Sequence, residues 1–299
     1  MPNLLQNIQR GDVKSLARAI SMVENEVNGY EDLLVALPFN PATKIIGITG
    51  APGAGKSTLV NALLHILVAN HNRVGILCID PSSPFNYGAL LGDRIRMSEW
   101  YNHPNVFIRS LATHGSMGGL HPKIIEITDL MKAAPFDHII VETVGVGQTE
   151  IEIAGLADTT VVVVVPEGGD EVQTMKAGLM EIADVFVVNK GDRDGADTFV
   201  NNLRMMMAPA FNNKQIEVAI VKTTASKNTG VAELLEKITE HQSIRKQSDK
   251  KSRLMAEKAY QLIQHKRMKG VNKIELKEAL DKAMEEKKFN LYTFVKNYN

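Results

Sequence analysis

The sequence contains one cysteine, Cys78, among 299 residues, so no disulfide framework can form within the chain. Cys78 lies inside the apolar run 74–79, which predicts a core residue in a reducing compartment. The chain has no excess of charge either, because 34 basic residues balance 34 acidic ones. This balance removes the global electrostatic case for binding nucleic acid or a membrane.

Long apolar segments are also missing. No apolar run approaches the roughly 20 residues of a membrane span. The first residues, 1–7, lack the basic and apolar parts of a secretory signal and the Arg- and Ser-rich character of a transit segment. We therefore expect a cytoplasmic protein.

A glycine-rich turn stands between the apolar run 45–48 and a helical pattern of apolar residues at 59–67. Backbone N–H groups can curl around phosphate oxygens at glycines, and the positive end of the following helix points at the same anion. Lys56 would reach the β- and γ-phosphates, and the Ser57 hydroxyl would bind Mg²⁺. The turn fits G-x-x-x-x-G-K-[ST], which predicts a phosphate site at Gly50, Ala51, Pro52, Gly53, Ala54, Gly55, Lys56, Ser57 and Thr58.

Apolar, β-rich runs alternate with helical segments from residue 44 onward. This alternation predicts an α/β fold of the P-loop NTPase type, with a mainly parallel, doubly wound sheet. The runs cover 44–49, 73–79, 106–109, 137–141, 159–165, 185–189 and 218–224. We expect helical extensions at both ends, which divides the chain into an N-terminal appendage at 1–41, a G domain at 42–242 and a C-terminal arm at 243–299.

Both predicted extensions show helical patterns. Gly11 and Asp12 form a plausible cap before an apolar face at Leu16, Ala17, Ile20 and Val23. In the C-terminal arm, apolar residues mark one amphipathic helix near 255–263 and another near 276–284. A helical tail with an apolar stripe needs a surface to pack on, and a partner subunit or the G domain itself would supply one.

A second motif, N-K-x-D, follows the apolar run 185–188. The Asp192 carboxylate can accept hydrogen bonds from both the ring N–H and the exocyclic amine of guanine, whereas adenine offers no such pair of donors. The Lys190 stem can lie over the base, Asn189 can connect loops, and we expect the Gly191 position to be unconstrained. The candidate guanine contacts are Asn189, Lys190, Asp192, Thr224 and Ala225, the last two through a backbone N–H.

Three acids, Asp80, Asp93 and Glu142, end strands or begin loops near the phosphate site. Mg²⁺ takes few direct protein ligands, so we expect Ser57 and phosphate oxygens to be the inner ligands and the carboxylates to hold its waters. Glu142 occupies the Walker B position, and the N–H of Gly145, three residues later, could bond the γ-phosphate. Lys56, Glu142 and Gly145 are therefore the candidate catalytic residues.

Hydrolysis is expected to be slow in the isolated protein. Ras-like proteins place a water-orienting glutamine directly after the switch glycine. Here that residue is Val146, and Gln148 comes two positions later. A partner, or a rearrangement of a dimer, would raise the rate.

Together these residues resemble the MeaB/ArgK-type GTPases. The resemblance covers about residues 6–240 and rests most on Asp-Pro-Ser-Ser-Pro at 80–84 and Glu-Thr-Val-Gly-Val-Gly-Gln at 142–148. It implies a homodimeric GTPase that acts as a chaperone of an adenosylcobalamin-dependent acyl-CoA mutase, usually methylmalonyl-CoA mutase. Such a chaperone gates cofactor loading and protects the mutase.

The resemblance also implies roles for particular residues. Asp80, Asp93 and Glu142 would belong to the Mg²⁺ and switch apparatus. Residues 168–176 would form a third switch loop facing the client, with Lys176 as a contact that depends on the nucleotide state. The C-terminal helices would be the dimerisation arm.

Two other functions are considered. A nickel- or cobalt-delivering GTPase needs Cys or His ligands, and the eight histidines show no paired ligand spacing. A kinase accessory to amino-acid transport would use ATP, which Asn189 and Asp192 argue against.

Overall fold

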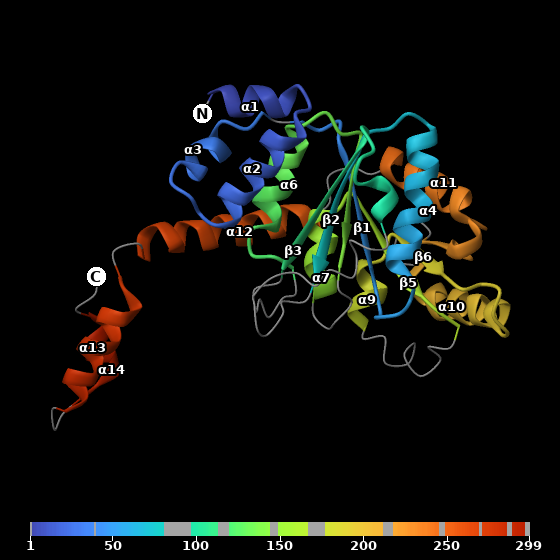
Figure 1. Cartoon of the computed structure of the whole chain (residues 1–299). Helices are drawn as coiled ribbons and strands as arrows, with labels where there is room; N and C mark the ends of the chain where they lie inside the picture. The colour runs from blue at the N-terminus through green and yellow to red at the C-terminus, as the bar shows by residue number, and fades with distance from the viewer. Residues whose placement is uncertain are drawn as a thin grey trace. The chain divides into compact units, whose positions relative to one another are not determined.

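A computed structural model of the chain describes residues 2–38, 40–80, 97–112, 120–143, 149–166, 177–211, 218–244, 249–268, 271–285 and 289–296 (Figure 1). The chain divides into two compact units, Met1–Lys251 and Ser252–Asn299. The predicted boundaries at residues 41 and 242 stay a prediction.

In the described part of the first unit, seven strands form one sheet in the order β3-β2-β4-β1-β5-β6-β7. Every neighbouring pair of strands is parallel. Each of the seven apolar runs of the sequence overlaps one of these strands, although β3 continues three residues past its run 106–109, and the predicted α/β fold is confirmed. The strands are β1 (Lys44–Gly50), β2 (Val74–Asp80), β3 (Val106–Ala112), β4 (His138–Glu142), β5 (Thr159–Val164), β6 (Val185–Val188) and β7 (Ala219–Lys222).

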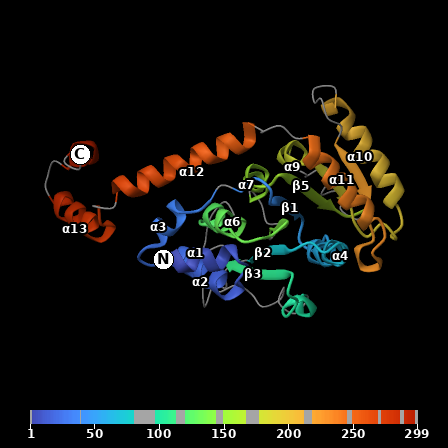
Figure 2. The ribbon, with the colours of Figure 1, turned by 90° about the horizontal axis from the view of Figure 1, so that it is seen from above.

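Helices cover both faces of the sheet (Figure 2). On one face, α4 (Lys56–Ala69) and α11 (Val231–Ile244) bury leucine, isoleucine and valine side chains against β1 and β5, in a core that also contains Cys78. On the other face lie α6 (Ile124–Lys132), α7 (Thr149–Leu156), α9 (Ala177–Ile182) and α10 (Ala196–Phe211). Successive side chains of a strand point to opposite faces of the sheet, and helices cover both faces. Side chains on both faces are therefore buried, which explains why the strands are nearly continuous apolar runs in the sequence.

Gly47 sets the distance between β1 and one of these helices. A Cβ at Gly47 would lie 2.7 Å from Cγ1 of Ile153 and 2.9 Å from Cβ of Ala157. Real side chains almost never approach so closely, so only glycine lets α7 and the turn after it pack directly on β1.

Three helices precede the sheet: α1 (Pro2–Gln9), α2 (Val13–Glu24) and α3 (Tyr30–Val35). Oδ2 of Asp12 accepts the backbone N–H of Ser15 at 3.0 Å, which confirms the predicted cap of α2. Ala17 is only half-buried, whereas Ala19 is fully buried together with the other predicted apolar positions of this helix. At the C-terminal end of α2, Glu24 accepts a hydrogen bond from Arg109 of β3.

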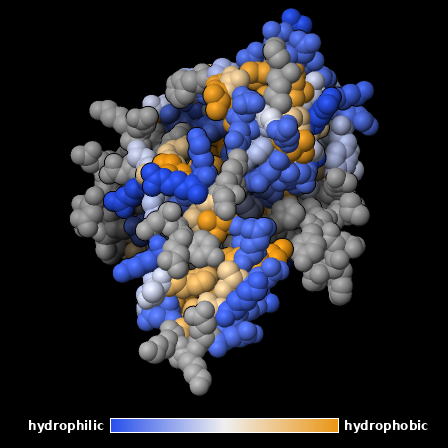
Figure 3. All heavy atoms as spheres, turned by 90° about the vertical axis from the view of Figure 1, so that its left-hand side faces the viewer, coloured by the Kyte–Doolittle hydropathy of each residue, from blue (hydrophilic) through white to orange (hydrophobic). Residues whose placement is uncertain are grey.

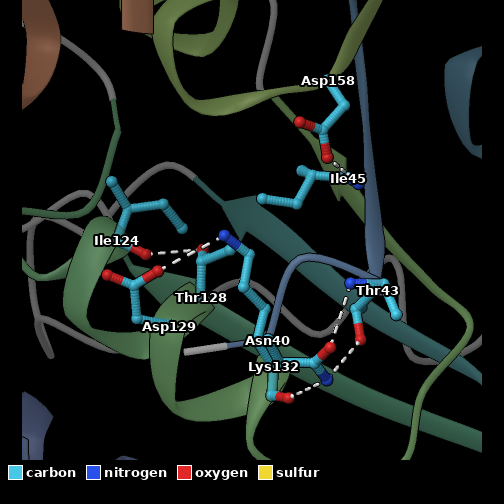
Figure 4. Close-up of polar contacts among 9 residues, drawn as sticks. Asn40, Thr43, Ile45, Ile124, Thr128, Asp129, Lys132 and Asp158 are labelled. Atoms are coloured by element: carbon cyan, nitrogen blue, oxygen red, sulfur yellow. Dashed lines mark hydrogen bonds and ion pairs between the residues drawn. The ribbon is translucent and has the colours of Figure 1, made fainter. Parts of the chain in front are cut away.

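The segment before β1 is held by side-chain hydrogen bonds (Figure 4). Asn40 donates from Nδ2 to the carbonyl of Lys132 at 2.8 Å and accepts the N–H of Ala42 at 3.0 Å. The Asp158 carboxylate, just before β5, accepts the N–H of Ile45 at 2.8 Å. These bonds fix the start of β1 against α6 and β5, and therefore fix the direction in which its far end points.

The second unit contains helical segments, as the apolar stripes predicted, and one further short helix that the sequence did not suggest. The chain enters it through α12 (Asp249–Met268), followed by α13 (Lys273–Met284) and α14 (Leu291–Val295). Asn272 and Asn290 cap the last two helices through their side chains. Many large hydrophobic side chains here are exposed: Met255, Tyr260, Leu262, Ile263, Met268, Ile274, Met284, Leu291, Tyr292 and Val295.

Hydrophobic side chains reach the molecular surface in patches separated by hydrophilic ones (Figure 3). Across the described ranges, none of the helices combines the length and the hydrophobicity that a membrane crossing requires.

Candidate nucleotide site

The predicted phosphate turn joins the end of β1 to the start of α4 (Figure 1). Gly50 has a φ of 141° and Gly55 a φ of 90°, values that side-chain-bearing residues rarely adopt. A Cβ at Gly50 would strike the Val163 carbonyl of β5, and one at Gly55 would strike the Asn189 side-chain amide. The turn is therefore closed on two sides, and its glycines cannot be replaced without moving the backbone.

Lys56, the first residue of α4, lies folded back over the turn. Its side chain is only 6 % exposed, and Nζ donates to the carbonyls of Gly50 at 2.8 Å and Ala51 at 3.0 Å. These bonds hold the ammonium at the mouth of the turn, where the helix N-terminus adds its own positive potential. A polyanion placed there would meet one full charge and several N–H groups.

Ser57, in the first turn of α4, and Glu142, the last residue of β4, lie next to each other. Ser57 Oγ donates to Glu142 Oε1 at 2.7 Å, and the Glu142 side chain is 5 % exposed. In the same region, Thr143 Oγ1 donates a hydrogen bond to Thr49 Oγ1 at 2.9 Å, which joins the ends of β1 and β4. The backbone of Asp80 ends β2, which pairs with β4.

Asn189 connects the phosphate turn to the loop after β7. Its Nδ2 donates to the Ala54 carbonyl at 2.9 Å. Its Oδ1 accepts from Thr223 Oγ1 and from the N–H of Ala225, both at 3.1 Å. The side chain is 3 % exposed and uses both ends of its amide, so the predicted connection between loops is confirmed.

The two residues expected at the base differ in environment. Lys190 has a φ of 56°, a left-handed conformation that is uncommon for lysine and that redirects the chain after Asn189. Asp192 is exposed, and its Oδ2 lies 2.8 Å from Nζ of Lys227. The hydrogen bond from Lys227 lowers the pKa of Asp192 and so favours the ionised carboxylate.

Gly191 is not the unconstrained position that the motif suggested. Its N–H donates to the Thr223 carbonyl at 2.8 Å. A Cβ would lie 2.6 Å from Cγ of Lys222 and 3.1 Å from the Thr223 oxygen. The residues that crowd Gly191, Lys222 and Thr223, come more than thirty positions later in the chain, so the constraint arises from tertiary packing and not from the motif itself.

Several predicted residues lie outside the described part of the chain. These are Asp93, Gly145, Val146, Gln148 and the loop 168–176 with Lys176. Their proposed roles, and the slow hydrolysis inferred from Val146, stay predictions. The structure instead adds Thr223 and Lys227, which sequence reasoning did not select because neither belongs to a short motif.

The described side chains form one continuous polar edge at the carboxyl ends of the strands. Lys56, Ser57 and Glu142 lie at β1 and β4, and Asn189 bridges from there to the ends of β6 and β7. Such an edge can hold a phosphate chain at one end and a purine base at the other, as expected for ligands of open parallel sheets.

Known proteins resemble this chain in sequence and in fold. The chain is 45 % identical over 250 residues to a putative GTPase of Pyrococcus abyssi, covering 82 % of this chain and 77 % of that one. It is 35 % identical over 206 residues to the mitochondrial methylmalonic aciduria type A homolog of Mus musculus, covering 64 % of this chain and 50 % of that one. A crystal structure of an LAO/AO transport system kinase superposes with a TM-score of 0.67 at 26 % identity, covering 94 % of this chain and 88 % of that one.

The family described as methylmalonyl-CoA mutase-associated GTPase, MeaB, matches residues 16–279. This match spans the sheet, the phosphate turn and the guanine motif. The chain therefore belongs to the MeaB family of GTPases, and its reaction is the hydrolysis of GTP.

Proposed function

We propose that GTP binds along the polar edge, with its phosphates in the turn 50–58 and its base at the N-K-x-D motif. The observation that supports this most is the Asn189 side chain, which ties the phosphate turn to the loop of Thr224 and Ala225. Asp192 would read the guanine N–H groups, the Lys190 stem would lie over the base, and the Ala225 loop would approach the guanine oxygen. Lys56 would neutralise the β- and γ-phosphates.

The donor set beside the turn fits Mg²⁺, which prefers oxygen ligands. Ser57 Oγ donates a hydrogen bond to Glu142 Oε1 at 2.7 Å, which places a hydroxyl oxygen and a carboxylate side by side at the end of the turn. Ser57, Glu142, Asp80 and Asp93 are the residues that would hold Mg²⁺ and its waters. When bound, the ion would neutralise charge that develops on the transferring phosphate.

Replacing Asp192 with asparagine tests the position of the base. Asp192→Asn presents an amide NH2 donor where the wild type presents a second acceptor oxygen, so we expect GTP affinity to fall about 10²-fold because two charge-assisted hydrogen bonds are disturbed. Xanthosine triphosphate, which offers a carbonyl at that position, should bind the variant better than GTP does. Both dissociation constants can be measured by calorimetry. An unchanged GTP affinity would mean that the base lies elsewhere.

We propose further that the GTPase acts as a chaperone of an adenosylcobalamin-dependent acyl-CoA mutase of the methylmalonyl-CoA mutase type, gating cofactor loading and protecting the enzyme. The family description names a mutase association, and the mouse relative carries the name of a methylmalonic aciduria protein.

The client can be identified by capture. The full chain, loaded with a non-hydrolysable GTP analogue, is used to pull partners from a lysate of its native cell, and GDP-loaded protein is the matched control. We expect a cobalamin-dependent mutase to be enriched and its activity to change on adding GTP. Recovery of a hydrogenase or urease maturation complex without a cobalamin enzyme would contradict the proposal.

A homodimer formed through the C-terminal helices is part of the same proposal. The large hydrophobic side chains exposed along α12, α13 and α14 support it, because packing against a second copy would remove them from water. Light scattering of the full chain would give the number of copies. Cytoplasmic location is likewise proposed, from the single cysteine, which is buried in the core.

A further inference from the structure

Two loops that flank the proposed base site are joined by several contacts. We call residues 189–195 the base loop and residues 223–230 the η2 loop, after the short helix η2 (Ala225–Lys227). Besides the Asn189 and Gly191 hydrogen bonds, one ion pair crosses directly between these loops, from Lys227 to Asp192 at 2.8 Å. A second ion pair lies close by, from Lys222 of β7 to Asp197 of α10 at 2.6 Å.

The η2 loop presents Lys227 from a fixed backbone. Thr224 and Thr229 exchange backbone hydrogen bonds at 3.0 and 3.3 Å, and the N–H of Lys227 donates to the Thr224 carbonyl at 2.9 Å. Gly230 closes the loop with a φ of 76°, and a Cβ there would strike the Lys222 carbonyl. The origin of the Lys227 side chain is therefore set by the fold.

We propose that Lys227 is a positioning residue for guanine recognition, holding the Asp192 carboxylate in the orientation in which its oxygens face the base. This inference rests on the proposed contact between Asp192 and guanine. Lys227 would not touch the nucleotide phosphates, and its effect would pass through Asp192.

The carboxylate has enough acceptor sites for this role. An ionised aspartate offers roughly four lone-pair positions on two oxygens. Guanine would use two of them, through its ring N–H and its amine, and Lys227 Nζ uses one on Oδ2. Lys227 can therefore stay in place while the base binds, and it does not compete with the base for Asp192.

The contribution of Lys227 is expected in binding and not in folding. The Lys227 and Asp192 side chains are 64 % and 42 % exposed, and ion pairs this exposed add little to the stability of the fold. Without Lys227, however, the exposed Asp192 side chain would lose its partner in the η2 loop, and more of its ordering would fall to the base on binding. Ordering of this kind weakens affinity.

The test compares two lysine-to-methionine variants of the full chain. In Lys227→Met we expect KM for GTP and Kd for GDP to rise about three- to tenfold, with kcat unchanged, because a base contact is equal in ground state and transition state. The rise should be smaller for inosine triphosphate, which lacks the amine and makes one bond fewer to Asp192. Lys222→Met removes a similar exposed pair from Asp197 and should change none of these values.

Two more variants separate the possible outcomes. Lys227→Arg keeps a cationic donor and should restore most of the affinity for GTP. If Asp192→Asn weakens GTP binding while Lys227→Met leaves it unchanged or tightens it, the positioning role is overturned and the base site stands. If Asp192→Asn has no effect either, the base site itself has been misplaced.

Discussion

Lys56→Met is expected to lower kcat/KM for GTP by about 10²- to 10³-fold or more, as the loss of one preorganised charge-stabilising donor does in other enzymes. The reason is local. Lys56 is 6 % exposed, and two carbonyls of the phosphate turn hold its ammonium at the turn's mouth. Methionine keeps the length and the packing of the stem but removes the only part that can neutralise phosphate charge. Single-turnover hydrolysis at sub-saturating GTP measures the effect.

A lysine remote from the turn provides the control. Lys132→Met removes a pair with Asp129 on α6 at 3.4 Å and should leave hydrolysis unchanged. Thermal unfolding would show whether Lys56→Met still folds, because the Gly50 and Ala51 carbonyls lose a donor. A folded Lys56→Met protein with the hydrolysis rate of the wild type would contradict the placement of the phosphates.

Asn189→Ala is expected to affect both stability and affinity. The change removes three hydrogen bonds at a site that is 3 % exposed, and leaves the Ala54 carbonyl and the Ala225 N–H without this partner. At about 1–3 kcal/mol for each such group, discounted for local relaxation, we expect a loss of about 2–4 kcal/mol in the free energy of unfolding. GDP affinity should fall about 10- to 100-fold, because the phosphate turn and the base loop lose their connection.

A smaller change at the same junction is the comparison. Thr223→Val removes only the hydroxyl that donates to Asn189 Oδ1 at 3.1 Å and should cost about 1 kcal/mol. Urea denaturation without nucleotide and calorimetry with GDP separate the two effects. Equal stabilities of Asn189→Ala and the wild type would show that the junction contributes nothing to the fold.

The sequence was sufficient for the parts of this molecule that depend on local pattern. Strands covered on both faces are nearly continuous apolar runs, so the seven described strands could be located, although the polar residues Arg109 and Ser110 concealed the end of β3. The phosphate turn could be located because its glycines, lysine and serine have the spacing that lets backbone N–H groups surround a phosphate. Asp12 could be recognised as a cap because its role involves only residues within three positions of it.

The remaining features depend on which distant segments meet. Gly191 looked unconstrained because the motif itself places nothing against it. The Thr223 carbonyl lies close to Gly191 because β6 pairs with β7, and the sequence does not show that pairing. Lys227 could not be selected for the same reason. The sequence placed Ser57 and Glu142 at the same edge of the sheet as candidate Mg²⁺ residues. It did not predict that they are hydrogen-bonded to each other, because that contact depends on β1 and β4 being neighbouring strands.

The position of β1 at the centre of the sheet has a consequence for how a nucleotide would leave. The phosphate turn extends from β1, the middle strand of the seven. The base loop follows β6, which is next to the edge of the sheet, and the η2 loop follows the edge strand β7; each of these two strands has four residues. Short marginal strands open by local fluctuation far more often than central ones. We therefore expect the base to detach first and the phosphates last, so that dissociation proceeds from the rim of the sheet inward.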